Sequence, residues 1–117
     1  MAFKSLVIFA LLSVLATAAF GSGIVGHWRP IQNPNDPAVV EIAKFAVAEH
    51  NKEAQAALGF VTVVKGETQV VAGTKYRLVI SAKDGSATKN YEALVWDKPW
   101  EKFRKLIFFK ESIAFNN

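Results

Sequence analysis

The sequence predicts an α+β fold in which an antiparallel sheet of roughly four to five strands wraps across a single long helix. A stretch with the helical period covers residues 37–57. The residues after it form valine-rich or alternating runs that short turns separate, a pattern typical of strands. Strands joined by short turns run antiparallel, and a helix then packs across one face of their sheet.

The size and composition of the chain limit what it can be. Its 117 residues allow one domain and no more. It contains no cysteine, which excludes disulfides, thiol catalysis, zinc–thiolate sites and iron–sulfur clusters. Burial must therefore hold the fold, and an apolar share of 51% makes this feasible. Basic and acidic residues are interspersed at a net charge of +4, so we expect no nucleic-acid partner, and we also expect no metal and no cofactor.

The first residues have the form of a secretory signal peptide. Lys4 provides a short basic region, an apolar run covers residues 6–19, and small residues follow. A transmembrane anchor is the competing interpretation, but the apolar run is nearer fifteen residues than the roughly twenty that a span needs. We expect a signal peptide over residues 1–21 with cleavage near residues 18–21, and a single domain over residues 22–117. The mature protein would then be secreted, to the extracellular space or the vacuole, and would leave the membrane.

The helix is preceded by a short extended segment over residues 24–32. Asp36 is a good N-cap and Pro37 suits the first helical position. The predicted apolar side of the helix consists of Val39, Ile42, Ala43, Ala46, Val47 and His50, of which His50 is expected to be a hydrogen-bonded structural side chain. On the exposed side, Glu41 with Lys44 and Glu49 with Lys52 have the spacing of weak ion pairs. Gly59 is expected to end this region.

Four strands are expected after the helix, over residues 60–68, 74–84, 89–97 and 103–111. Gly66 is a candidate bulge in the first of them. The second alternates regularly and should therefore be buried on one face only. A turn at residues 84–86 joins the second strand to the third.

Two of the turns are unusual for what they carry. The turn between the first two strands is the apolar pentapeptide Gln69-Val70-Val71-Ala72-Gly73, which closes on a residue suited to positive φ. The turn at residues 97–102 carries Pro99 and Trp100 among charged residues. Exposed apolar side chains of this kind are typical of contact surfaces. The alternative is that the valines are strand ends tucked against the core and that Trp100 folds back onto the sheet edge.

Both turns should lie side by side, because alternate turns of a meander emerge at the same end of the sheet. The extended segment around Gly26 reaches this end if it pairs along the sheet. We therefore expect one surface built from Gly26, from residues 69–73 and from Pro99 and Trp100.

These motifs resemble those of the cystatins, and in particular the plant group (phytocystatins). The pentapeptide fits the family's Gln-x-Val-x-Gly, Pro99-Trp100 fits its second hairpin, and Ile42-Ala43-Lys44-Phe45-Ala46-Val47-Ala48-Glu49-His50-Asn51 fits the plant helix pattern. The three occur in order over most of the chain. One departure is His27, which stands between Gly26 and Trp28 where plant members usually carry a second glycine.

The resemblance implies a reversible, competitive inhibitor of papain-like cysteine proteases, with a role in plant defence where the target is foreign. The segment at Gly26 would lie along the non-primed subsites, residues 69–73 would enter the cleft, and Pro99-Trp100 would cover the primed side. The catalytic cysteine would be blocked without a bond to cut. The chain stops before the second, legumain-directed domain of longer members, so we expect no such activity.

Other functions fit the sequence less well. An enzyme is not expected, because the chain has two histidines, no cysteine and no clustered carboxylates at metal spacing, and we identify no catalytic residue. A non-inhibitory binding or storage protein with the same fold remains an alternative. We expect the active form to be a monomer. Opening of the Val70-Val71 hairpin would allow two chains to exchange halves and form an inactive dimer.

Overall fold

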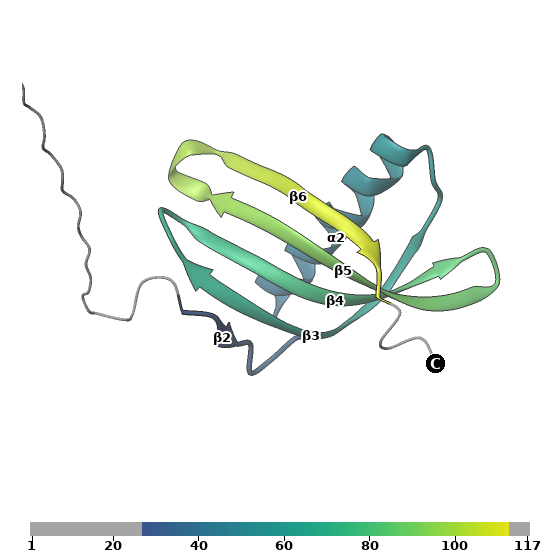
Figure 1. Cartoon of the computed structure of the whole chain (residues 1–117), viewed down its shortest axis with the longest axis horizontal. Helices are drawn as coiled ribbons and strands as arrows, with labels where there is room; N and C mark the ends of the chain where they lie inside the picture. The colour runs from purple at the N-terminus through teal and green to yellow at the C-terminus, as the bar shows by residue number, and fades with distance from the viewer. Residues whose placement is uncertain (1–26, 113–117) are drawn as a thin grey trace, which may run out of the picture.

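The computed structural model describes residues 27–112, and its elements follow in the predicted order (Figure 1). They are β2 (Arg29–Pro30), α2 (Pro37–Ala54), β3 (Gly59–Val70), β4 (Thr74–Asp84), β5 (Ala87–Lys98), the 3₁₀ turn η2 (Pro99–Glu101) and β6 (Phe103–Glu111). Gly26 and the predicted signal peptide at residues 1–21 lie outside the described residues, so both stay predictions.

The fold class is confirmed. Five antiparallel strands form one sheet in the order β2-β3-β4-β5-β6, and α2 packs across one of its faces (Figure 1). The predicted bounds of β4 and β6 match the structure, whereas β3 and β5 extend further toward the hairpin tips. The longer β5 includes Lys98, which was predicted to lie in the turn.

The beginning of the helix follows the sequence prediction. The Asp36 carboxylate accepts a hydrogen bond from the backbone N–H of Ala38 at 2.9 Å, and Pro37 occupies the first turn. Five residues of the predicted apolar side are buried: Val39, Ile42, Ala43, Ala46 and Val47. The sixth, His50, is half-buried and stacks on Phe109 with ring centroids 4.2 Å apart. Among the predicted ion pairs, Lys52 lies 3.3 Å from Glu49, whereas Glu41 pairs with Arg104 of β6 instead of with Lys44.

The end of the helix differs from the prediction. The helix ends at Ala54 instead of near residue 57, and Gln55 caps it in the left-handed conformation at φ 53°. The Asn51 side chain explains the early end, because it donates to the carbonyl of Leu58 and accepts from its N–H, both at 2.9 Å. These bonds turn the chain back toward the sheet, and Gly59 begins β3 rather than ending the helical region.

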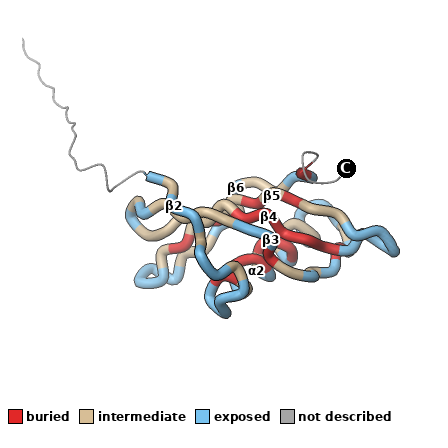
Figure 2. Tube along the Cα trace, turned by 90° about the horizontal axis from the view of Figure 1, so that it is seen from below, coloured by how far each residue is buried: buried red, intermediate tan, exposed pale blue. Residues whose placement is uncertain are grey.

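The core lies between α2 and the middle of the sheet, where the buried segments gather in Figure 2. Leu78, Ile80 and Val95 are its largest fully buried side chains. The prediction that β4 is buried on one face only is wrong for its second half. Val79 and Ser81 on the outer face are each only 8% exposed. Val79 forms part of the lining of an outer groove that also includes Ile31 and Ser112.

Gly66 is not a bulge. It pairs with Leu78 in regular register, and the bulges fall where the register skips Val61 and Val64 in β3 and Ile107 in β6. A Cβ on Gly66 would lie 2.5 Å from Leu78 Cδ2 and 3.0 Å from Ile31 Cδ1. Position 66 must therefore be glycine because Leu78 and Ile31 pack closely over it, and not because the backbone is irregular there.

Replacing Gly66 by alanine should reduce the free energy of unfolding by about 2 kcal/mol, because the added methyl overpacks a site beside a fully buried leucine. Urea unfolding would measure the change. Gly59→Ala is the matched control, since nothing lies within 4 Å of a Cβ there. Equal effects of the two substitutions would contradict the packing explanation.

Candidate functional site

Three segments meet at one end of the sheet (Figure 1). They are the β3–β4 hairpin tip, the η2 turn between β5 and β6, and β2, which pairs with Thr68 and Glu67 near the end of β3. The two tips touch, because the indole N–H of Trp96 donates to the carbonyl of Ala72 at 3.1 Å. The prediction that the tips lie side by side is confirmed.

The first tip is a three-residue loop. Val70 pairs with Thr74, and Val71, Ala72 and Gly73 connect them. Both Ala72 and Gly73 have positive φ, at 34° and 103°. A positive φ is unfavourable for the alanine but not for the glycine. The Val71 N–H donates to the Gly73 carbonyl at 3.0 Å. This bond and the one that Trp96 donates to Ala72 hold the loop in its shape.

Gly73 is needed by the fold itself. A Cβ at this position would lie 2.4 Å from the carbonyl oxygen of Asp97 and 2.6 Å from Cγ of Lys98. Only a glycine allows the two hairpins to approach this closely. A larger residue at position 73 would therefore disturb the packing of the two hairpins as well as any contact with a partner.

The second tip presents Trp100 outward. Pro99 begins the 3₁₀ turn, and Lys102 closes it in the left-handed conformation, its N–H donating to the carbonyl of Pro99 at 3.0 Å. Trp100 is 65% exposed. The alternative in which its ring folds back onto the sheet edge is therefore not what the structure shows.

Five large apolar side chains are exposed among residues 27–112: Val61, Val64, Val70, Trp100 and Ile107. Val61, Val64 and Ile107 are the extra residues of the three bulges, so the local backbone explains why they point outward. Val70 and Trp100 have no such explanation. They lie at the two adjacent tips, which makes that end of the sheet the candidate binding surface.

The other pentapeptide positions differ in exposure. Gln69 and Val71 are half-buried, and Ala72 is exposed. Of the predicted surface, the structure thus brings together residues 69–73, Pro99 and Trp100, while Gly26 lies outside the described part of the chain. Within residues 27–112, no group of His, Cys, Asp or Glu is placed to hold a metal ion, and no helix is long and apolar enough to cross a membrane.

Trp96 supports both tips, and the sequence analysis missed it. Its ring meets that of Phe103 edge-on with centroids 5.6 Å apart. The Lys98 ammonium lies 4.5 Å from the Trp96 centroid and 4.6 Å from that of Phe103. The alternation of buried and half-buried residues along β5 places Trp96 on the outer face, a signal present in the sequence.

A buried carboxylate anchors the second tip to the helix. Asp97 is 6% exposed and accepts a hydrogen bond from Nε of Arg104 at 2.7 Å. The same guanidinium donates to Glu41 of α2 at 3.1 Å. The hydrogen bond that Arg104 donates to Asp97 raises the pKa of Arg104 above its ordinary value. Burial, followed by the charge of Asp97, raises the pKa of the neighbouring Tyr76.

Comparison with known sequences adds to this geometry. A family model described as SQAPI, aspartic acid proteinase inhibitor, matches residues 31–112. A protein of Actinidia chinensis var. chinensis named cysteine proteinase inhibitor 1 is 59% identical over 86 residues, which are 74% of this chain and 74% of the relative. Cysteine proteinase inhibitor 5 of Arabidopsis thaliana is 56% identical over 101 residues, covering 86% of this chain and 80% of the relative.

Solved structures share the fold. A salivary cystatin of the soft tick Ornithodoros moubata superposes with a TM-score of 0.67 at 23% identity, over 76% of this chain and 99% of that one. The squash aspartic acid proteinase inhibitor superposes with a TM-score of 0.57 at 28% identity, over 82% of this chain and 97% of that one.

Replacing Arg104 by methionine should reduce the free energy of unfolding by about 3 kcal/mol, because it leaves the Asp97 carboxylate buried without its charged partner. The control is Glu41→Gln, which should change stability by less than about 1 kcal/mol because the Glu41 side chain is 69% exposed. Urea unfolding of both variants checks this. A smaller loss for Arg104→Met than for Glu41→Gln would contradict the anchoring role.

Proposed function

We propose that this chain, which belongs to the cystatin family and to its plant cysteine proteinase inhibitors, is a reversible competitive inhibitor of papain-like cysteine proteases. The chain is not an enzyme, and its relatives of Actinidia and Arabidopsis are named as cysteine proteinase inhibitors. What supports the proposal in the structure is one observation: Val70 and Trp100, exposed without a local reason, lie at adjacent tips.

The mechanism we propose is a wedge. Residues 69–73 enter the active-site cleft, Pro99 and Trp100 cover the primed side, and the segment at Gly26 follows the non-primed subsites. Val70 and Trp100 supply apolar area for burial. The close packing of Gly73 against Asp97 keeps the pentapeptide in a tight turn. The target's cysteine therefore meets this turn instead of an extended substrate strand.

Rigidity supports tight binding in this mechanism. The loop bonds of Val71 and Ala72 and the anchor between Asp97 and Arg104 fix both tips before any partner arrives. Loops that are already ordered lose little conformational entropy on docking. An interface of ordinary size then suffices for the affinities typical of protease inhibitors.

The family model suggests aspartic proteases as a second class of target. The matching family model is described as an aspartic acid proteinase inhibitor, whereas plant relatives of Actinidia, Arabidopsis and rice at 40 to 59% identity are named cysteine proteinase inhibitors. We give the cysteine proteases precedence, because identity to those relatives is higher than the 28% to the squash inhibitor. Pepsin is therefore the contrasting enzyme in the test, and a non-inhibitory binding protein is the remaining alternative.

Titration of papain with the purified protein and a small fluorogenic substrate should show competitive inhibition with a Kd of roughly nanomolar order. Trp100→Ala should raise the inhibition constant about thirtyfold and Val70→Ala about fivefold, as expected of interface anchors. The free energy of unfolding should change by less than about 0.5 kcal/mol in both, because both side chains lie in solvent.

The matched control is Val61→Ala, which removes the same methyl groups from β3 at its other end, where Val61 is 46% exposed. It should leave the inhibition constant unchanged. Equal effects at Val61 and Val70 would refute the tip surface. Inhibition of pepsin but not of papain would move the proposal to the aspartic class, and inhibition of neither by folded protein would leave the non-inhibitory alternative.

We also propose that the monomer is the active form and that opening of the first hairpin permits a dimer. Positive φ at Ala72 stores strain on the order of 1 kcal/mol, which an extended strand would release. Size-exclusion chromatography with a papain assay on each peak tests this: the dimer should be inactive, and Ala72→Gly should lower its share, since glycine accepts positive φ without strain. An equally active dimer would rule the proposal out.

A further inference from the structure

A row of side chains crosses the outer face of the sheet, opposite α2, directly beneath the two tips. Lys75 of β4 pairs with Trp96 of β5, and Trp96 pairs with Lys105 of β6. Side chains of directly opposed residues lie on the same face of a sheet. The Trp96 indole donates to the carbonyl of Ala72, so this row lies at the base of the first tip.

Three lysines at this end of the sheet have no acidic partner. In the described part of the chain, no carboxylate lies within ion-pair distance of Lys75, Lys102 or Lys105. Lys102 closes the turn η2, and both it and Lys105 are exposed. Lys75 is half-buried, and its ammonium lies 5.3 Å from the centre of the Trp96 ring. We call these three lysines the cationic flank.

The acidic side chains beside the flank are already neutralised. Asp97 is buried against Arg104, at 2.7 Å from its Nε atom, and Glu101 lies 3.4 Å from the Lys98 ammonium. Residues 97–105 hold four basic side chains against two acidic ones. An excess of positive charge therefore remains around the second tip.

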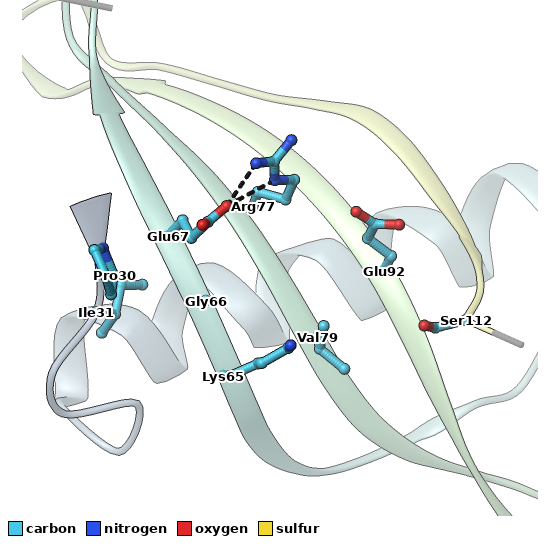
Figure 3. A pocket seen from close by; sticks show the side chains of 9 residues that line it. All are labelled: Pro30, Ile31, Lys65, Gly66, Glu67, Arg77, Val79, Glu92 and Ser112. Atoms are coloured by element: carbon cyan, nitrogen blue, oxygen red, sulfur yellow. Dashed lines mark hydrogen bonds and ion pairs between the residues drawn. The ribbon is translucent and has the colours of Figure 1, made fainter. Parts of the chain in front are cut away.

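The groove further along the outer face is balanced in charge. It has a volume of about 500 Å³, lies beside β2 and is lined by side chains of both signs (Figure 3). Arg77 of β4 donates to the carboxylate of Glu67 of β3, and Glu92 of β5 lies 3.9 Å from the Lys110 ammonium of β6. The unbalanced positive charge therefore lies next to the tips and not in the groove.

We propose that the cationic flank selects proteases that carry acidic residues on the surface beside the active-site cleft, by attracting them before the tips dock. The proposal rests on the proposed function, because the flank adjoins the tips that are to enter the cleft. Adjacent strands lie about 4.8 Å apart, so Lys75 and Lys105, on β4 and β6, are separated by about 10 Å. Charges act over about this distance in 0.1 M salt, so the lysines act together on an approaching surface.

The flank acts on the rate of association. Attraction between charged surfaces raises this rate by roughly tenfold to a thousandfold and is screened by salt. Charges at the rim of an interface change the association rate and its salt dependence, whereas buried contacts mainly change the rate of dissociation. A merely structural role of the lysines would not make the association rate depend on the charge of the partner.

Papain with an altered surface charge tests the proposal. Its active-site thiol is blocked reversibly while its lysines are either succinylated, which replaces each ammonium by a carboxylate, or acetylated, which only removes the charge. At an ionic strength of about 0.01 M, where charges act over about 30 Å, the wild-type protein should associate about tenfold faster with the succinylated enzyme. At about 1 M salt the two association rates, measured by stopped-flow inhibition, should be equal.

The variant Lys102→Gln/Lys105→Gln should reduce this preference to about threefold, because it removes charge from the flank and nearly keeps the side-chain length. Its dissociation rate and its urea unfolding should stay unchanged. The matched control is Lys44→Gln/Lys83→Gln, which removes the same charge from exposed positions on α2 and at the other end of β4. The control should keep the tenfold preference.

The outcomes separate this proposal from the proposed function. If the variant and the control show the same preference, the proposal is overturned, because the position of the charges is then irrelevant. If the wild-type protein inhibits papain without preferring the succinylated enzyme, the proposal is overturned while the proposed function stands. If it inhibits neither native papain nor its two modified forms, the proposed function fails and the proposal with it.

Discussion

The packing of α2 into the curve of the sheet is the interaction on which the rest of this structure depends. The chain has no cysteine, so burial between these two layers must supply the stability that small secreted domains often obtain from disulfides. Ala43 and Ala46 are completely buried on the helix, and their small size lets the sheet come close. Opposite them, Leu78, Ile80 and Val95 fill the space between the layers.

That packed layer carries the proposed binding surface at one end. Arg104 links the helix, through Glu41, to the buried Asp97 at the base of the second hairpin. The backbone of Asp97 in turn contacts Gly73 of the first hairpin. The position of each tip is thus coupled to the other and to the helix, and neither is an independent flexible loop. A chain of contacts running from the core to the exposed Trp100 connects stability with the geometry of recognition.

Local patterns predicted the order of the elements and both hairpin tips, because periodicity and turn residues are properties of short stretches. They failed where a distant residue decides. The helix ends at Ala54 because Asn51 binds Leu58 across the following turn, and Gly66 is small because Ile31 and Leu78 pack over it. The sequence around Asp97 indicates the start of a charged turn, and the burial of Asp97 becomes understandable only from its hydrogen bond with Arg104 of the next strand. The packing role of Gly73 also depends on distant residues, because Asp97 and Lys98 of the other hairpin leave no room for a side chain there.

The bulges in β3 and β6 have a consequence for how the molecule behaves in a crowded solution. In the described part of the chain, β2 pairs with β3 at Glu67 and Thr68 and Ile31 adds one bond to Gly66, so the first half of β3 has no neighbouring strand on its outer side. β6 forms the opposite edge. Flat open edges recruit strands from other molecules and lead to aggregation. Skipping Val61, Val64 and Ile107 breaks the regular ladder along both edges, so a neighbouring chain finds no continuous template to extend. The same valines and isoleucine that raise the exposed apolar area thereby disfavour polymerisation through the sheet edges.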